Sequence, residues 1–274
     1  MIVASCRANF TATNSLAKAN AYRNFTNPAL STAFSDLTKD EFLAQAASKH
    51  VCILVHGYNN PMENVMNAYW GLVQSMRDTQ LIGPNCYGLV VGFAWPGFQS
   101  APGFFPALKN AKKSGPFLSD LINDLGTVAQ SIDIQTHSLG ARVALTALSN
   151  PKKVLIENLI TSAPAVDNDI LETDRDFFAS LNSCKRCFIY HSKHDSALKF
   201  GFKFGDIFDG IHDALGLTGP ANKEKTLKDN PNLYVVDCSG RVKDHGGYRN
   251  VPQYYEHWKK VRSGEIADRY GVLA

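Results

Sequence analysis

The chain lacks the features that mark several classes of protein. None of its apolar runs reaches the roughly 20 residues that a membrane-spanning helix needs. No run of basic residues stands out, and 28 Lys and Arg against 25 Asp and Glu leave a net charge of only +3, too small to indicate a nucleic-acid partner. Internal repeats, low-complexity tracts and linkers are also lacking. We therefore expect one domain over residues 1–274, with no nucleic acid as partner and no integral membrane segment.

An export signal is not expected at the amino terminus, because Met1–Arg7 has neither a basic segment nor a long enough apolar one. Val3-Ala-Ser-Cys6 matches a bacterial lipoprotein cleavage box, but no signal segment precedes it, and we interpret residues 1–7 as a first edge strand. The six cysteines are scattered, and Cys52 and Cys238 fall in or at the end of predicted strands. Free cysteines that serve as small hydrophobic residues suit a reducing compartment, so the expected location is cytoplasmic.

A metal motif is lacking as well. Cys184 and Cys187, followed by His191 and His194, first suggest zinc. However, residues 188–190 between them read as part of a strand, and the spacing matches no common zinc motif. We expect no metal, and the chemistry inferred below requires no cofactor.

What the chain does have is the composition of a folded α/β protein. Hydrophobic residues make up 45% and charged residues 19%, enough for a sizeable core. Strand-like and helix-like segments alternate, which predicts a mostly parallel sheet with helices on both faces. The predicted strands cover residues 51–55, 87–94, 131–135, 155–161, 186–191 and 233–237. The predicted helices cover residues 38–48, which begin with a capping box, 61–78, 107–129 with a break at Gly115-Pro116, and 174–181. Another predicted helix begins at the turn after the strand at 131–135 and runs to 149, and a terminal helix begins at 252.

Ser138 stands between a predicted strand and a predicted helix, in the segment Thr136-His-Ser-Leu-Gly140. This pattern is a nucleophile elbow, Gly-x-Ser-x-Gly, with Thr136 in place of the first glycine. Such a turn strains the serine backbone, needs small neighbours, and presents the hydroxyl at the amino end of a helix, where negative charge is favoured. The alternative is a serine that merely caps an ordinary helix.

A second motif follows the strand at 51–55, which leads into His56-Gly-Tyr-Asn59. A strand that ends in His-Gly beside a tight loop supplies one amide of an oxyanion hole in serine hydrolases of this type. We expect the two donors to be the amides of Leu139, which follows the serine, and Tyr58, with Asn59 as the alternative for the loop amide. His56 comes too early in the chain for the catalytic base, so we expect a structural role for it.

A serine nucleophile needs a base, and the base needs a carboxylate that holds its tautomer. Ser138, Asp195 and His245 follow in the order nucleophile, acid, base, each just past the carboxyl end of a predicted strand. Asp167 also follows a strand and remains the alternative acid. His257 lies in a predicted helix among aromatic residues, so we expect it to serve packing.

Taken together, these motifs resemble those of the α/β-hydrolase superfamily, and most closely a mainly bacterial esterase-like group within it. That group has His-Gly-Phe-Asn, Trp-Pro, His-Ser-Met-Gly and Ser-x-x-Asp-x-Ala-Leu in this order. The corresponding segments here are His56–Asn59, Trp95-Pro96, His137–Gly140 and Ser192–Leu198. The resemblance runs from about residue 51 to 248, and it implies the α/β-hydrolase fold, with Asp195 as the acid. The departures are Thr136 and Tyr58, and the motifs do not specify a substrate.

Two segments could roof the substrate pocket, residues 98–107 and 199–230. Both are rich in Phe, and the spacing from Phe204 to Leu215 suits a short amphipathic helix. Such a helix would be a lid or an acyl-binding wall, or it would simply pack on the sheet. The candidate substrate-binding residues are His137, Trp95, Phe98, Phe204 and Phe208.

The sequence therefore predicts a serine hydrolase that cleaves carboxylic esters through a Ser-His-Asp triad and an acyl-enzyme intermediate. If the lid interpretation holds, the substrate is a small-molecule ester with an apolar acyl group. Two alternatives remain open. One is an acyltransferase or thioesterase that uses the same triad, and the other is a non-catalytic binding protein with a hydrolase fold.

Overall fold

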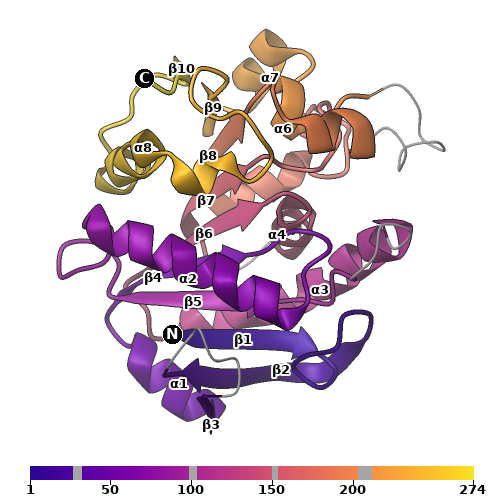
Figure 1. Cartoon of the computed structure of the whole chain (residues 1–274). Helices are drawn as coiled ribbons and strands as arrows, with labels where there is room; N and C mark the ends of the chain where they lie inside the picture. The colour runs from indigo at the N-terminus through magenta and orange to yellow at the C-terminus, as the bar shows by residue number, and fades with distance from the viewer. Residues whose placement is uncertain (27–32, 99–103, 150–153, 203–211) are drawn as a thin grey trace.

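The computed structural model of the chain describes residues 1–26, 33–98, 104–149, 154–202 and 212–274. Ten strands form one sheet in the order β10-β9-β8-β7-β6-β4-β5-β1-β2-β3 (Figure 1). Neighbouring strands pair in parallel from β10 to β1, and antiparallel pairs β1–β2 and β2–β3 complete the sheet. The strands are β1 Ile2–Arg7, β2 Leu16–Phe25, β3 Phe34–Leu37, β4 His50–Val55, β5 Leu89–Ala94, β6 Ser131–His137, β7 Ile156–Ser162, β8 Cys184–His191, β9 Leu233–Asp237 and β10 Tyr270–Val272.

Helices cover the sheet on both faces (Figure 1). The α-helices are α1 Lys39–Ala46, α2 Met62–Asp78, α3 Phe104–Leu125, α4 Gly140–Leu148, α6 Leu215–Thr218, α7 Lys223–Asp229 and α8 Pro252–Ser263. On one face α3 packs against both α4 and α1, while α2 packs against α8. Short 3₁₀ helices span η2 Phe178–Ser183 and η4 Gly247–Asn250, and Ala197–Phe202 (η3) is a π-helix. The predicted mostly parallel α/β architecture is confirmed.

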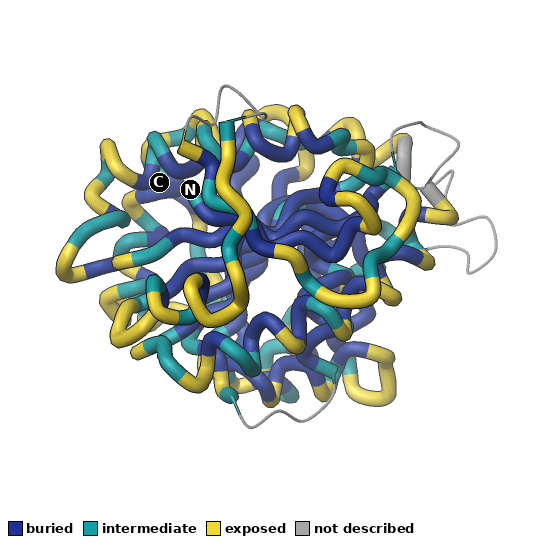
Figure 2. The backbone as a smooth tube through the Cα atoms, turned by 90° about the horizontal axis from the view of Figure 1, so that it is seen from below, coloured by how far each residue is buried: buried dark blue, intermediate teal, exposed yellow. Residues whose placement is uncertain are grey.

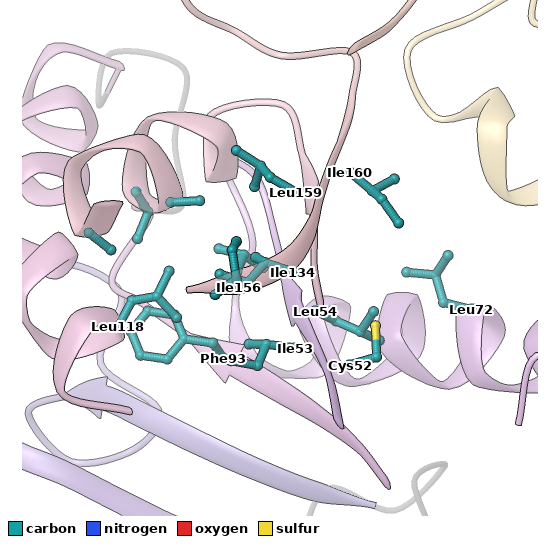
Figure 3. Packing of buried hydrophobic residues seen from close by; sticks show 14 of the residues in the cluster. Cys52, Ile53, Leu54, Leu72, Phe93, Leu118, Ile134, Ile156, Leu159 and Ile160 are labelled. Atoms are coloured by element: carbon teal, nitrogen blue, oxygen red, sulfur yellow. The ribbon is translucent and has the colours of Figure 1, made fainter. Parts of the chain in front are cut away.

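The core lies between the sheet and these two layers of helices (Figure 2). Successive residues of a strand face opposite sides of a sheet, so β4 contributes to both layers. Figure 3 shows Ile53 on the side of Leu118 from α3, and Cys52 and Leu54 on the side of Leu72 from α2. The three β4 residues are fully buried, as expected for a parallel strand that is covered on both faces.

All six predicted strands are present, with bounds that differ by a few residues at most. The predicted capping box is also present at the start of α1. The Thr38 hydroxyl accepts a hydrogen bond from the Glu41 amide at 3.2 Å, and the Glu41 carboxylate accepts one from the Thr38 amide at 2.8 Å. The short helix predicted at 174–181 is the 3₁₀ helix at Phe178–Ser183.

The prediction of an edge strand at the amino terminus was wrong. β1 is an interior strand, paired in parallel with β5 on one side and antiparallel with β2 on the other. All six residues of β1 are buried. The antiparallel pair β2–β3, which the sequence pattern did not predict, covers the edge that β1 would otherwise present.

The predicted break at Gly115-Pro116 was also wrong, because α3 runs through it as one helix with Pro116 inside. The glycine serves close packing. A Cβ at position 115 would lie 2.5 Å from Cγ2 of Thr146 on α4. The absence of a side chain therefore lets α3 and α4 approach each other, which explains why a residue with poor helix propensity occupies this position.

The two expected roof segments are only partly described. In the segment 98–107, residues 104–107 are the start of α3, and residues 99–103 lie outside the described part. Phe204 and Phe208 lie outside it as well, so the predicted amphipathic helix from Phe204 is untested over 204–211. Residues 212–214 are described and are not helical, and Ala214 instead pairs with Asp167 in an isolated β-bridge.

Candidate active site

The turn between β6 and α4 has the strained geometry of a nucleophile elbow. Ser138 has a φ of 55°, in the left-handed region that non-glycine residues rarely adopt. Its amide donates to the carbonyl of Ser162 on β7 at 3.0 Å, which anchors the turn to the neighbouring strand. A Cβ at Gly140 would lie 2.6 Å from the carbonyl oxygens of Val55 and His56. Glycine is therefore required there for the elbow to pack against the end of β4.

The loop after β4 lies directly against the elbow. A Cβ at Gly57 would be 2.8 Å from Cβ and 3.3 Å from Oγ of Ser138. Leu139, at the amino end of α4, lies next to the serine in the chain, and the first amides of a helix have no partner within it. The Asn59 amide donates to the Gly97 carbonyl at 3.0 Å, so it is already engaged. The choice between the Tyr58 and Asn59 amides as the second oxyanion donor stays a prediction, with Tyr58 as the expected donor.

The structure brings Asp195 and His245 together. Oδ2 of Asp195 lies 2.7 Å from Nδ1 of His245, and Oδ1 accepts a hydrogen bond from the Leu198 amide at 2.9 Å. Asp195 is completely buried, whereas the His245 side chain is 25% exposed. Asp195 follows β8 and His245 follows β9, which are adjacent parallel strands, so both residues lie at the same edge of the sheet. A buried carboxylate can only accept from this imidazole, which assigns the proton of a neutral His245 to Nδ1.

His137 links this pair to the elbow. Its Nε2 donates to the main-chain carbonyl of His245 at 2.8 Å, and the two rings lie 4.7 Å apart. Burial, assisted by the neighbouring His245, lowers the pKa of His137 to about 3. A neutral His137, immediately before Ser138, therefore fixes the backbone of the residue that carries the candidate base.

The alternative acid, Asp167, lies elsewhere. Its carboxylate is 3.9 Å from the Arg142 guanidinium of α4, and its backbone pairs with Ala214. Among the described contacts, the carboxylate that bonds to the His245 ring is that of Asp195.

Two other histidines also have clear places. His56 is buried beneath the loop that it begins, and it stacks on Trp95 with ring centroids 5.4 Å apart. The Trp95 indole donates to the His56 carbonyl at 2.7 Å. Nδ1 of His257 forms a hydrogen bond of 2.7 Å with the Tyr190 hydroxyl, within an aromatic cluster. Both placements agree with the structural roles expected for these residues.

Three of the five candidate substrate-binding residues, Trp95, Phe98 and His137, lie in the described part of the chain. Trp95 has no exposed surface, so its ring stacks on His56 and does not form an open pocket wall. Phe98 is partly buried, and its amide donates to the Thr13 carbonyl at 2.7 Å, which places it beside the loop between β1 and β2. His137 precedes Ser138 and contacts His245, as described above. The remaining two, Phe204 and Phe208, lie outside the described residues.

Sequence reasoning missed Arg7, which ends β1 at this same edge and is 1% exposed. Its guanidinium contacts the loops after both β4 and β5. The only signal in the sequence was a charged residue closing an otherwise apolar strand, a common way for a strand to end.

Within the described ranges, no group of three or more His, Cys, Asp or Glu side chains is arranged to hold a metal ion. All six cysteines are buried and none forms a disulfide. No helix among the described residues is long and apolar enough to span a membrane.

Comparison with known proteins agrees with this architecture. A solved structure of the products of gene lin2722 from Listeria innocua has a TM-score of 0.51 at 11% identity, covering 83% of this chain and 99% of that one. The Pyrococcus furiosus esterase Pf2001 has a TM-score of 0.42 at 15% identity, covering 90% of this chain and 86% of that one. The first likeness concerns the fold alone, and the second is too remote to carry an argument. No curated protein matches the sequence significantly.

A family model gives the decisive match. The model described as "Alpha/beta hydrolase of unknown function (DUF900)" matches residues 32–239, which include Ser138 and Asp195. Arg7 and His245 lie outside the matched residues. Since the match extends over most of the chain, the protein belongs to this family of α/β-hydrolases.

Proposed function

We propose that the protein is a serine hydrolase that cleaves carboxylic esters through Ser138, His245 and Asp195. The observation that carries the proposal is the 2.7 Å contact between buried Asp195 and Nδ1 of His245, at the sheet edge where Ser138 stands in a strained turn. A buried carboxylate that orients an imidazole beside a strained serine is the arrangement that activates a hydroxyl for attack on a carbonyl.

The reaction begins with the His245 proton on Nδ1, which leaves the lone pair of Nε2 as the base. As the Ser138 oxygen bonds to the ester carbonyl carbon, Nε2 takes the hydroxyl proton, and the carbonyl electrons move onto oxygen. The amides of Leu139 and Tyr58 stabilise this oxyanion, together with the amino end of α4. Asp195 stabilises the imidazolium that forms.

The protonated His245 then gives its proton to the alkoxide leaving group as the carbon–oxygen bond of the ester breaks. The alcohol departs, and the acyl group remains on Ser138. Water attacks this acyl-enzyme with His245 again as the base, and the second tetrahedral intermediate expels Ser138, which recovers its proton from His245. The products are a carboxylic acid and an alcohol, and no cofactor takes part in either half.

The proposed substrate is an ester with an apolar acyl group. Phe98 supports this assignment, since it is partly buried beside the elbow-facing loop, and its backbone is held in place by Thr13. Gly97, next to Phe98, accepts from Asn59 of the loop that abuts Ser138. An aromatic side chain on this segment is suited to contact an acyl chain near the nucleophile.

The test is mass-spectrometric labelling with a fluorophosphonate, applied to wild type, Ser138→Ala and the control Ser196→Ala. Ser196 is an exposed serine that directly follows Asp195, so it reports non-specific modification near the site. We expect labelling of wild type and Ser196→Ala at Ser138, none at position 138 in Ser138→Ala, and a loss of about four or more orders of magnitude in turnover for that variant. Near-normal turnover of Ser138→Ala would disprove the assignment.

The same three proteins should then be assayed on p-nitrophenyl esters of increasing acyl length. Turnover that rises with chain length supports an acyl-binding wall, and indifference to chain length contradicts it. A strong preference for a thioester or for an acceptor other than water would replace hydrolysis of esters by thioester hydrolysis or acyl transfer on the same triad. A folded wild type that is neither labelled nor active would indicate a binding protein.

A further inference from the structure

Arg7, at the end of β1, is a buried cation. It is 1% exposed, although arginine is almost never fully buried unless it is paired. Among the described residues, no carboxylate lies within ion-pair distance of its guanidinium. Burial lowers the pKa of Arg7 to about 10, so the side chain is still charged at neutral pH. Such a costly placement calls for an explanation in its contacts.

These contacts join two loops. Nε donates to the Trp95 carbonyl at 3.0 Å, in the loop after β5, and Nη2 donates to the Asn60 carbonyl at 2.8 Å, at the end of the loop after β4. Nη2 also lies 3.4 Å from Nε2 of His56, at the start of that loop. One rigid, planar group thus contacts both ends of residues 56–60 and ties them to the neighbouring loop.

His56 continues the connection toward the serine. Its Nδ1 donates to the Gly57 carbonyl at 2.7 Å, and its Nε2 accepts from the Trp95 amide at 3.1 Å. Burial first, and then the charge of Arg7, hold the pKa of His56 well below its usual value, so the ring is neutral and suits both contacts. Gly57 in turn lies against Cβ and Oγ of Ser138. A chain of direct contacts therefore runs from Arg7 through His56 and Gly57 to the nucleophile.

We propose that Arg7 is a positioning residue. It holds the loop at residues 56–60 so that an amide of this loop faces the oxyanion that forms when Ser138 attacks the ester carbonyl. The inference rests on the proposed function, because it presumes that this loop supplies an oxyanion donor. It assigns a catalytic purpose to β1, a strand that precedes the residues 32–239 matched by the family model. A guanidinium suits this purpose, since its donors are fixed in direction and reach two carbonyls at once.

The test separates positioning from simple stability by counting active sites. Wild type, Arg7→Met, Arg7→Lys and the control Val3→Ala are each reacted to completion with a fluorophosphonate, and the labelled fraction and the labelling rate are measured separately. Val3 lies in the same strand and has no exposed surface, so its truncation weakens the core without touching the loops. Ester turnover is then expressed per labelled site, with kcat and KM determined separately.

We expect Arg7→Met to reach a labelled fraction near that of wild type but to lose about 10- to 100-fold in kcat and in labelling rate, since a small misplacement of a reacting group has effects of this size. KM should change less than about threefold, because the oxyanion contact forms only in the transition state. Arg7→Lys should lose less kcat than Arg7→Met, because its ammonium group replaces some of the N–H donors of the guanidinium. Val3→Ala should retain kcat per labelled site.

Two results would overturn the inference. The first is Arg7→Met with unchanged kcat per labelled site, whether or not its labelled fraction falls, since that is the behaviour of a residue that only stabilises the fold. The second is Val3→Ala with the same loss per site as Arg7→Met. If wild type itself is neither labelled nor active, the proposed function fails, and the role of Arg7 fails with it.

Discussion

The substitution Asp195→Asn tests the proposed triad most directly, because the structure fixes how the new amide must lie. Oδ1 of Asp195 accepts from the Leu198 amide at 2.9 Å, while Oδ2 faces Nδ1 of His245 at 2.7 Å. In Asp195→Asn, the amide oxygen must stay toward the Leu198 donor, so that the NH₂ group points at His245. Nδ1 then becomes an acceptor, and the imidazole proton moves to Nε2. The nitrogen that should take the Ser138 proton is no longer a base.

The magnitude follows from the loss of two effects, the correct tautomer and the negative charge beside the imidazolium. An acid-to-amide change in a Ser-His-Asp triad lowers kcat by about 10⁴-fold, which corresponds to about 5.4 kcal/mol in the activation free energy. The fold should persist, since Asn is nearly isosteric and keeps the bond to Leu198. The assay is p-nitrophenyl ester hydrolysis together with the fluorophosphonate labelling rate, and thermal unfolding checks the fold.

The matched control is Asp167→Asn, which changes the alternative acid in the same way. Asp167 contacts the Arg142 guanidinium at 3.9 Å, so we expect kcat to change by less than about tenfold. The reasoning is refuted if Asp195→Asn retains wild-type kcat, or if Asp167→Asn shows the larger loss.

Two further predictions concern residues around the serine. Gly57→Ala should lower kcat by about 100-fold, because the new Cβ would lie 2.8 Å from Cβ of Ser138 and displace it. The control Gly71→Ala on α2, where a Cβ meets nothing within 4 Å, should keep full activity. Equal activity of both variants would contradict the packing argument. Acid should destabilise the fold through His137, whose pKa is lowered to about 3 from 6.5. Between these values the unfolded chain binds a proton that the native state does not, so stability falls as pH falls from about 6.5 toward 3. Urea unfolding at pH 7 and pH 4.5 measures the loss of unfolding free energy between the two pH values. This loss should be smaller for His137→Gln than for wild type, and the control His194→Gln, at an exposed position, should lose as much as wild type. Equal losses in wild type and His137→Gln would contradict the prediction.

Much of the candidate site could be predicted because its residues follow strands. Parallel neighbours in one sheet end at one edge, so Ser138 after β6, Asp195 after β8 and His245 after β9 had to lie at that edge whatever the packing of the helices. The strands themselves were recognisable as apolar runs, since both faces of a parallel strand are buried. The assignment of Asp195 over Asp167 came instead from the motif around it, and the contact with His245 agrees with it.

The parts that were missed depend on contacts distant in sequence. β2 carries Asn and Lys and has no apolar run, and it becomes a strand by pairing with β1, as context overrides its weak β propensity. Gly115 appears as a helix breaker until α4 is placed against it. Arg7 is separated from Asn60 by 53 residues and from Trp95 by 88, so no local pattern could show that one guanidinium joins them.

These distant contacts determine how precisely the loops near Ser138 can be placed. The hydroxyl of Tyr69, from α2, accepts from the His56 amide at 3.0 Å and donates to the Phe93 carbonyl at 2.6 Å, so it fixes the ends of β4 and β5 from a helix. Arg7 fixes the loops just beyond the same strand ends from β1. A hydrogen-bond donor serves an oxyanion only if it is held within a fraction of an ångström, and side chains locked by buried polar contacts provide that precision. The buried polar groups at this edge are therefore best explained by the geometry that they impose on the loop at residues 56–60, because their burial alone would weaken the fold.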